Sequence, residues 1–518
     1  MGIPTEIGTA DNTTGDQWRW RGIRRLWHRE LEHYPARAAR VRYLAVVVLA
    51  TVVLYFELYV TSGAATLLLT DLHMSFLYFV LALAAGNFVG AFGSLFAGFT
   101  DRSGRANLVV IGLLVTGLLT LVVLPQVRTG LGWAIGTMAV SFVEGIILVA
   151  TPALIRDFSP QVGRATAMGF WAMGPVLGSL VVSLVASTTL PIYNSWQSQY
   201  VICGAIGLVM FVVALFGLRE LSPQLRSQLI VSARDRALLE ARSRGIDVAA
   251  SLRHPWRQVL RFDVIVSAFG VSVMLLIYYT EVAFFTIYAV TIFGFTLAQA
   301  NQLGNWAWAA NAVALLAAGL LSDRFRVRKP FMLAGGIGGA VTVLVFLLQV
   351  DRQPSFATLA VIVSLISVTL ALAYAAWMAA FTETVEARNP ALTGTGLAVW
   401  GWLLRLVVTA SFLVIPFMVN TVTTLVAAPE HLEQYQRARA EGLPISPELT
   451  AQLAAIHQAA LDAPGQWRSW FWVCFAGVVV FLLLISVMKG RWSPSAALRD
   501  QQEHDRKVTA ELARLNSP

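Results

Sequence analysis

Charged residues and cysteines are scarce in this chain of 518 residues. Only 13% of the residues are charged, against about 25% in soluble proteins, and 57% are hydrophobic. The two cysteines, Cys203 and Cys474, both lie in apolar stretches, so the sequence implies neither a disulfide framework nor a cysteine metal cluster. The composition excludes a set of soluble domains and predicts an all-α membrane protein.

Signatures of nucleotide and metal binding are lacking as well. No G-x-x-x-x-G-K-[ST] loop occurs, so the chain is not expected to use ATP. His28 and His33 are five residues apart, which places them on different faces of a helix, and a zinc site is not expected there. We expect neither enzyme activity nor a cofactor.

Lysine occurs only three times although the net charge is +9, so nearly all basic residues are arginines. They cluster in short segments between apolar stretches, as in the cytoplasmic loops of membrane proteins, and no nucleic-acid partner is expected. The bias toward arginine suggests a GC-rich bacterial genome. The first 42 residues are polar and show no cleavable signal pattern.

Twelve apolar stretches are long enough to cross a bilayer, which takes about 20 residues. They lie at residues 43–70, 75–98, 107–124, 131–154, 165–189, 199–218, 264–292, 299–321, 331–349, 356–380, 394–420 and 467–488. Arginines occupy the amino-terminal segment and alternate loops. The positive-inside rule therefore predicts a multi-pass plasma-membrane protein with both termini in the cytoplasm.

A polar segment divides the chain into two halves. We expect an amino-terminal bundle at 43–218, a cytoplasmic linker at 219–262 and a carboxy-terminal bundle at 263–488. Residues 1–42 and 489–518 are expected to be cytoplasmic, and 421–466 to form an external loop of two short helices split near Pro444. Within the first segment, residues 18–31 fit an interfacial helix on the lipid surface, or else a solvated basic tail.

Three glutamates, Glu57, Glu144 and Glu281, lie near the middle of apolar stretches. A carboxylate at that depth costs about 2.5–3.5 kcal/mol, so such side chains face the interior of a bundle. Arg405 is the basic residue placed deep in a span. We predict that these four residues line a central cavity that handles protons and substrate. The alternative is that they only make structural polar contacts between helices.

The two halves of the sequence show an internal repeat. Asp101 and Arg102 follow the second stretch, and Asp323 and Arg324 follow the eighth, at an offset of 323 − 101 = 222 residues. The same offset carries position 57 to 279, two residues from Glu281. This pattern predicts two parallel repeats of six helices with a binding site between them.

Residues 97–105 resemble the loop signature G-x-L-a-D-r-x-G-r-k of the major facilitator superfamily. Matching residues are Asp101, Arg102, Gly104 and Arg105, and the second copy keeps Asp323 and Arg324. The resemblance implies the twelve-helix fold of that family. It also implies a gating motif, in which charges at helix ends stabilise one of two access states. The alternative is an ordinary basic loop.

A second resemblance lies in the fifth stretch, where Gly169, Gly174, Pro175 and Gly178 are similar to the family's antiporter signature G-x-x-x-G-P-x-x-G. It implies a kinked, closely packed helix and a proton-driven exporter; a generic small-residue packing seam is the alternative. In the fourth stretch, Ser141 and Glu144 replace the arginine and glutamine of the family pattern R-x-x-q-G. The family's arginine-based proton relay is therefore not expected here.

Together these features predict a proton-coupled transporter that works by alternating access, as a monomer in the lipid bilayer. Its partners would be protons and a small organic molecule. A carboxyl group in an apolar cavity holds a proton more readily than one in water, so a cationic substrate would compete with protons. This favours export by antiport. Two alternatives are symport of an organic acid paired with Arg405, and a lipid-handling or non-transporting scaffold.

Overall fold

The computed structural model describes residues 28–96, 104–159, 164–225, 260–350, 352–386 and 393–495, together with residues 499, 502 and 506. Among these, twelve helical segments are long and apolar enough to cross a membrane, which confirms the predicted number. The first half contains β1 (Glu30–Leu31), α2 (Arg37–Gly63), α3 (Ala65–Asp71), α4 (Phe76–Phe96), α6 (Arg105–Leu118), η2 (Leu119–Val123), η3 (Leu124–Gln126), α7 (Gly130–Phe158), α8 (Arg164–Ala172), α9 (Gly174–Tyr193), α10 (Trp196–Gly217) and β2 (Glu220–Leu221). The second half contains α14 (Phe262–Met274), α15 (Leu276–Phe293), α16 (Leu297–Phe325), α17 (Lys329–Leu347), α18 (Phe356–Glu386), α19 (Thr393–Met418), α20 (Val422–Ala440) and α21 (Pro447–Leu484).

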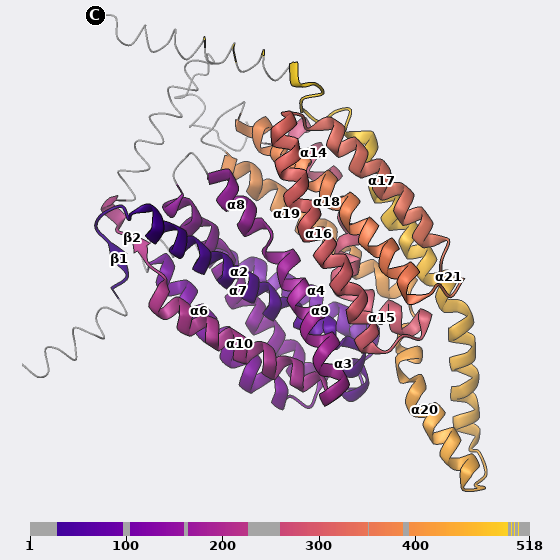
Figure 1. The fold of residues 1–518 in the computed structure, drawn as a ribbon. Helices are drawn as coiled ribbons and strands as arrows, with labels where there is room; N and C mark the ends of the chain where they lie inside the picture. Colours follow the sequence, from indigo (N-terminus) through magenta and orange to yellow (C-terminus); the bar gives the residue numbers. More distant parts are fainter. Residues whose placement is uncertain are drawn as a thin grey trace, which may run out of the picture.

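The helices form two bundles that lie side by side, indigo to magenta for the first half and pink to yellow for the second (Figure 1). Contacts between the bundles run from α9 to α16, from α4 to α19 and from α2 to α15. We call the end at which α2 begins the terminal end, and the opposite end, which carries α20, the hairpin end. The ribbons of the two halves converge toward α3 and α15, at the hairpin end (Figure 1).

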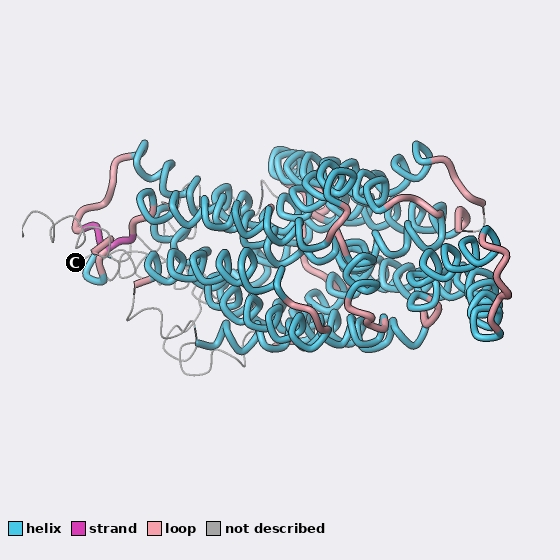
Figure 2. Tube along the Cα trace, turned by 90° about the horizontal axis from the view of Figure 1, so that it is seen from below, coloured by secondary structure: helices cyan, strands magenta, loops and turns pink. Residues whose placement is uncertain are grey.

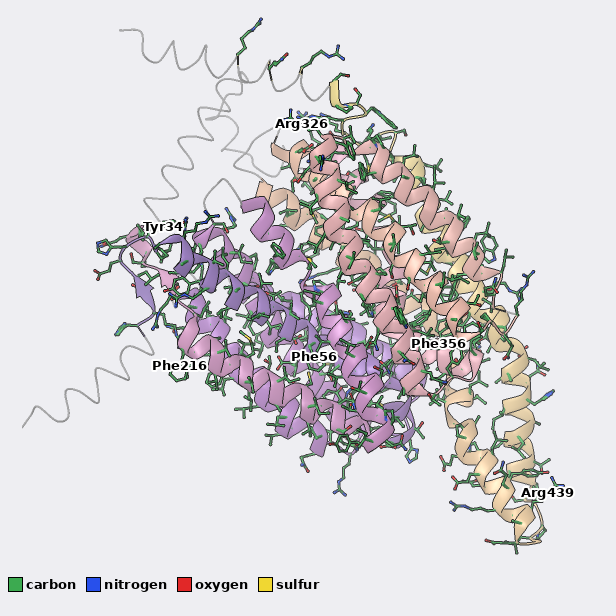
Figure 3. The ribbon with its side chains drawn as sticks, viewed as in Figure 1. Tyr34, Phe56, Phe216, Arg326, Phe356 and Arg439 are labelled. Carbon is green, nitrogen blue, oxygen red and sulfur yellow. The ribbon has the colours of Figure 1, made fainter. Side chains whose placement is uncertain are left out.

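Two elements outside the membrane spans differ from the sequence-based expectation. Helix α21 is continuous from Pro447 to Leu484, so the second helix of the expected external loop is part of the last span. Together α20 and α21 form a hairpin that projects from the bundle, with Arg439 near its tip (Figure 3). At the other end, Leu31 lies in a strand and not in an interfacial helix; residues 18–27 and 226–259, in the expected tail helix and linker, lie outside the described residues.

A short parallel strand pair closes the terminal end of the first half. Glu30 and Leu31 of β1 pair with Glu220 and Leu221 of β2, visible at one end of the tube in Figure 2. Beside them, Arg29 is only 1% exposed. Its guanidinium donates to Asn107 Oδ1 at 2.9 Å and to three carbonyls near the end of α10: Ala214 O at 3.3 Å, Leu215 O at 2.7 Å and Leu218 O at 3.2 Å. A cation here satisfies carbonyls that a helix end leaves unpaired.

Hydrogen bonds join the two halves near the hairpin end. Thr286 Oγ1 of α15 donates to Ser62 O of α2 at 2.6 Å, and Asn301 Nδ2 of α16 donates to Gly63 O at 2.8 Å. Beside them, the amide of Phe76 donates to Thr423 Oγ1 of α20 at 2.9 Å. These bonds stabilise an arrangement in which the halves are closed against each other at the hairpin end.

Removing the Arg29 cap should destabilise the first half. Arg29→Ala leaves carbonyls of α10 and Asn107 without their charged donor, and one such hydrogen bond is worth about 1.5–3 kcal/mol. We expect a lower midpoint of thermal unfolding in detergent, followed by tryptophan fluorescence. Arg42→Ala, at an exposed position of α2, is the control and should leave the midpoint unchanged. An equal midpoint for both variants would contradict the capping role.

Weakening the bond between Asn301 and Gly63 should shift the protein away from the closed hairpin end. Asn301→Ala removes a buried interhelical hydrogen bond worth about 1 kcal/mol, roughly fivefold in the ratio of the two states. Spin labels at positions 194 and 294, in the hairpin-end loops of the two halves, should report longer distances. Gln302→Ala, an exposed neighbour on α16, should report wild-type distances. Identical distance distributions for both variants would rule out this contribution.

Candidate functional site

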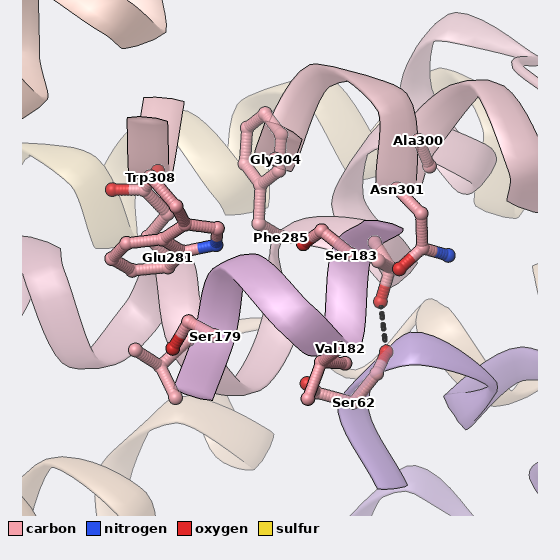
Figure 4. Close-up of a pocket in the computed structure, with 12 residues that line it drawn as sticks. Ser62, Ser179, Val182, Ser183, Glu281, Phe285, Ala300, Asn301, Gly304 and Trp308 are labelled. Carbon is pink, nitrogen blue, oxygen red and sulfur yellow. Dashed lines mark hydrogen bonds between the residues drawn. The ribbon is translucent and has the colours of Figure 1, made fainter. Parts of the chain in front are cut away.

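A pocket lies between the two halves and is lined by α2, α9, α15 and α16. The space between its lining residues, open solvent included, is about 330 Å³. Its polar lining consists of one carboxyl group, serine hydroxyls, an asparagine amide and an indole, shown in Figure 4. These residues are Glu281, Ser62, Ser179, Ser183, Thr286, Asn301 and Trp308. Because both halves contribute, any motion of one half against the other reshapes the pocket.

Glu281 is the acidic residue of this pocket, and Figure 4 shows it beside Trp308. It lies on α15, six residues after the helix break at Leu275. Its Oε1 is buried and has no hydrogen-bond partner among the described residues. Ser367 of α18 also interacts with the carboxyl group. An oxygen aimed into a pocket without a partner is available to a proton or to a ligand donor.

Aromatic side chains of both halves pack near Trp308, which lines the pocket. Tyr278 of α15 packs edge-to-face on Trp308, with ring centroids 5.4 Å apart, and also on Tyr279. The ring centroids of Tyr55 and Tyr59 of α2 lie 5.6 Å apart. Tyr59 packs against the apolar cluster that contains Trp308. Such rings suit an amphipathic ligand, because their faces attract cations and their area buries apolar groups.

Arg405 lies on α19, outside the pocket lining. Its side chain is exposed, and its charge acts on the hydroxyls of Tyr55 and Tyr279, one from each half. Arg405 therefore interacts with both halves, from a different helix than Glu281.

Glu57 and Glu144 lie outside the interface pocket. They are 4% and 1% exposed inside the first half, and neither lines the interface pocket. Glu57 packs against Gly207 of α10, where a side chain would collide with its carboxyl group. The expectation of one cavity shared by all three glutamates therefore does not describe this pocket, to which only Glu281 contributes.

The gating motif is described in part: Asp101 and Arg102 lie outside the described residues. Gly104 precedes α6 with φ of 85°, a conformation that favours glycine. Arg105 forms a bidentate ion pair with Asp157 at the end of α7, at 3.0 and 2.9 Å. These contacts tie the start of the third span to the end of the fourth.

The second copy makes a related contact. Asp323 pairs with Arg328 at 2.7 Å, and Arg328 pairs with Glu383 at the end of α18 at 2.8 Å. Arg324 is exposed in the last turn of α16. The offsets 328 − 105 = 223 and 383 − 157 = 226 show that the two arginine–acid pairs are repeat equivalents. Sequence analysis missed Asp157, Arg328 and Glu383, because their offsets of 223 and 226 residues differ from the offset of 222 between Asp101 and Asp323.

The fifth span is broken where its glycine–proline motif lies. Helix α8 ends at Ala172, and α9 begins with Gly174 and Pro175, since proline suits the first turn of a helix. A Cβ at Gly174 or Gly178 would press on the Tyr55 side chain of α2, so both glycines permit close helix packing. Gly169 has no atom within 4 Å of where a Cβ would stand.

Solved structures of membrane transporters share this fold. A bacterial homolog of the human lysosomal transporter Spinster, inward-facing and unoccupied, gives a TM-score of 0.64 at 15% identity, covering 89% of this chain and 100% of that chain. The D-xylose-proton symporter gives 0.58 at 14% identity, covering 82% and 97%. The partially occluded, inward-open xylose transporter XylE from E. coli gives 0.56 at 14%, covering 86% and 98%.

Sequence comparison gives the family directly. No curated protein matches the sequence. Residues 47–408 match the Major Facilitator Superfamily. The matched range covers ten of the twelve predicted spans in full or in large part. The match agrees with the two bundles, the pocket between them and both copies of the loop signature. The chain therefore belongs to the major facilitator superfamily of transporters.

Proposed function

We propose that this protein exports a small amphipathic or cationic organic molecule in exchange for protons. The observation that carries the proposal is the interface pocket, lined by Glu281 and Trp308, in which one Glu281 carboxyl oxygen has no hydrogen-bond partner in the described part of the chain. A cationic group can replace a proton at this carboxyl group, and the aromatic rings can hold the rest of the ligand. Binding one or the other while the halves rock would couple the two fluxes.

Alternating access requires that the pocket open at only one end at a time. The hydrogen bonds of Thr286 and Asn301 close the hairpin end in this structure. The positive-inside rule places the terminal end in the cytoplasm, and the Spinster homolog of similar fold is inward-facing. We therefore take the structure to represent the inward-facing state of a plasma-membrane protein that works as a monomer.

The charged motifs at the terminal end are proposed to set the balance between the two states. In the first copy, Asp101, Arg102, Gly104 and Arg105, it is Arg105 that pairs with Asp157. In the second, Asp323 and Arg324, Asp323 pairs with Arg328, which also pairs with Glu383. Because those pairs hold α6 on α7 and α17 on α18, each bundle moves as one body. Gly174, Pro175 and Gly178 then allow α9 to pack closely on α2 as the halves move.

Proton symport of an organic acid is the second candidate. Arg405 favours it, because its guanidinium interacts electrostatically with Tyr55 and Tyr279 and suits a carboxylate ligand. One similar structure is a D-xylose-proton symporter, so the fold also serves symport.

The topology follows from the arginine distribution and is directly testable. A reporter fused after Pro518 or inserted at Ser232 should be active only in a cytoplasmic assay. A reporter inserted at Glu441, at the hairpin, should be active only outside. An external signal at either of the first two sites would overturn the assignment of the terminal end to the cytoplasm.

Glu281 and Arg405 separate the two candidate functions. In proteoliposomes with an imposed pH gradient, Glu281→Gln should abolish transport of an organic cation, since the variant cannot exchange a proton. Arg405→Ala should reduce that transport at most a few-fold, but should abolish uptake of an organic acid. Asn305→Ala, a polar neighbour on α16, controls for general disturbance of the interface. If Glu281→Gln retains full transport driven by the pH gradient, the proposed role of Glu281 is wrong.

A further inference from the structure

The hydrogen-bond donors at the hairpin side of the interface pocket are used within the protein itself. Thr286 Oγ1 donates to Ser62 O at 2.6 Å. Both donor positions of the Asn301 amide are filled, by Gly63 O and Leu297 O, each at 2.8 Å. The Ser62 hydroxyl donates at 2.7 Å to a carbonyl one turn earlier in α2. This side of the pocket therefore holds the helices together and has few donors left for a ligand.

The opposite side of the pocket, toward the terminal end, contains Glu281, Ser179 and Trp308. Glu281 lies five residues before Thr286 on α15. Trp308 lies seven residues after Asn301 on α16, which runs back in the opposite direction. Figure 4 shows both of them, together with Ser179 of α9, on the side of the pocket away from Asn301.

Two oxygens on this terminal side are buried without a hydrogen-bond partner in the described part of the chain, Glu281 Oε1 and Ser179 Oγ. Ser179 is only 4% exposed. The carboxyl oxygen belongs to the second half and the hydroxyl to the first. Because buried oxygens in folded proteins nearly always have a partner, these two are open to a ligand that brings donors.

The lining of the pocket favours a cation among such ligands. The residues that line it include no arginine, lysine or histidine, so a carboxylate bound there would find no opposite charge. A metal ion needs several oxygen ligands, and Glu281 is the single acid of the lining. No group of three or more histidine, cysteine or acidic residues that could hold a metal occurs among the described residues. An organic cation remains.

The oxygens and the aromatic rings make different demands on that cation. Trp308 and Tyr278 pack edge-to-face with centroids 5.4 Å apart, and a ring face attracts any positive charge, whether or not it carries hydrogens. Glu281 Oε1 and Ser179 Oγ need N–H groups. A quaternary ammonium ion has the charge but no N–H, so it would cover both oxygens and leave them unpaired, which weakens binding.

We propose that the pocket binds a primary or secondary ammonium group, which donates to Glu281 of the second half and to Ser179 of the first, and that it selects against quaternary ammonium ions. The inference rests on the proposed function, because it specifies the class of cation that Glu281 exchanges for a proton. Ser179 is then a specificity-determining residue. Since the two oxygens belong to different halves, the bound head group joins the halves.

A series of ligands with one apolar body tests the selectivity. Phenethylamine and its N-methyl, N,N-dimethyl and N,N,N-trimethyl derivatives are all cations at neutral pH, and they differ in the number of N–H groups. Isothermal titration calorimetry of the full-length protein in detergent gives their dissociation constants. We expect phenethylamine and its N-methyl derivative to bind at least about tenfold more tightly than the trimethyl derivative, since the latter loses every hydrogen bond of its head group.

Ser179→Ala isolates the hydroxyl. The Ser179 oxygen has no partner among the described residues, so the variant should fold with the thermal midpoint of wild type. It should bind phenethylamine about tenfold more weakly and the trimethyl derivative as wild type does. Thr188→Ala is the control on the same helix, because the exposed Thr188 hydroxyl donates to carbonyls of its own helix. This variant should bind all four ligands as wild type does.

Three results would overturn the selectivity and leave proton-driven export of cations standing. They are equal affinities for all four ligands, wild-type binding of phenethylamine by Ser179→Ala, and a loss in Ser179→Ala that the trimethyl derivative shares equally. If none of the four ligands binds, the assignment of an ammonium ligand is wrong. If phenethylamine is selected but a pH gradient does not drive its transport in proteoliposomes, the binding site stands and the proposed exchange with protons fails.

Discussion

The cost of burying a charge in an apolar bundle governs where the acidic side chains of this protein lie. At the terminal end, where water is near, acids are paired: Asp157 with Arg105, and Glu383 with Arg328. At mid-depth, Glu57, Glu144 and Glu281 retain oxygens that have no hydrogen-bond partner among the described residues. An ion pair at a helix end holds two helices together, whereas an unpaired buried acid stabilises nothing. The deep acids therefore lower the stability of the bundle.

The sequence predicted the number of spans and the division into halves, because hydropathy reports burial in lipid and loop charge reports the linker. It did not predict which way each deep side chain faces. Glu57 and Glu281 occupy equivalent depths in the two repeats, yet one faces its own bundle and the other faces the interface. In these helices the lipid-facing and protein-facing sides are both apolar, so periodicity carries little information about orientation. The contacts of residues outside the spans were the least predictable, because they join residues that are far apart in the sequence.

The two halves nevertheless cap the start of their third span in the same way. The third span of each half begins with backbone amides that have no partner within the helix. In the first half, Glu220, just after the sixth span, accepts from Arg105 N at 2.8 Å. In the second, Arg491 O, just after the twelfth, accepts from Arg328 N at 3.0 Å. In each repeat the chain that leaves the bundle thus caps a helix within it.

The length of α21 has a mechanical consequence. Its 38 residues span roughly 57 Å at 1.5 Å per residue, about twice the thickness of the hydrocarbon core. One continuous helix therefore runs from the packed interior of the second half to the free tip of the hairpin, near Arg439 (Figure 3). A small tilt of the second half therefore produces a larger displacement at the tip of the hairpin. A fluorophore near Leu443 would thus follow single turnovers from outside the membrane, without a label in the binding site.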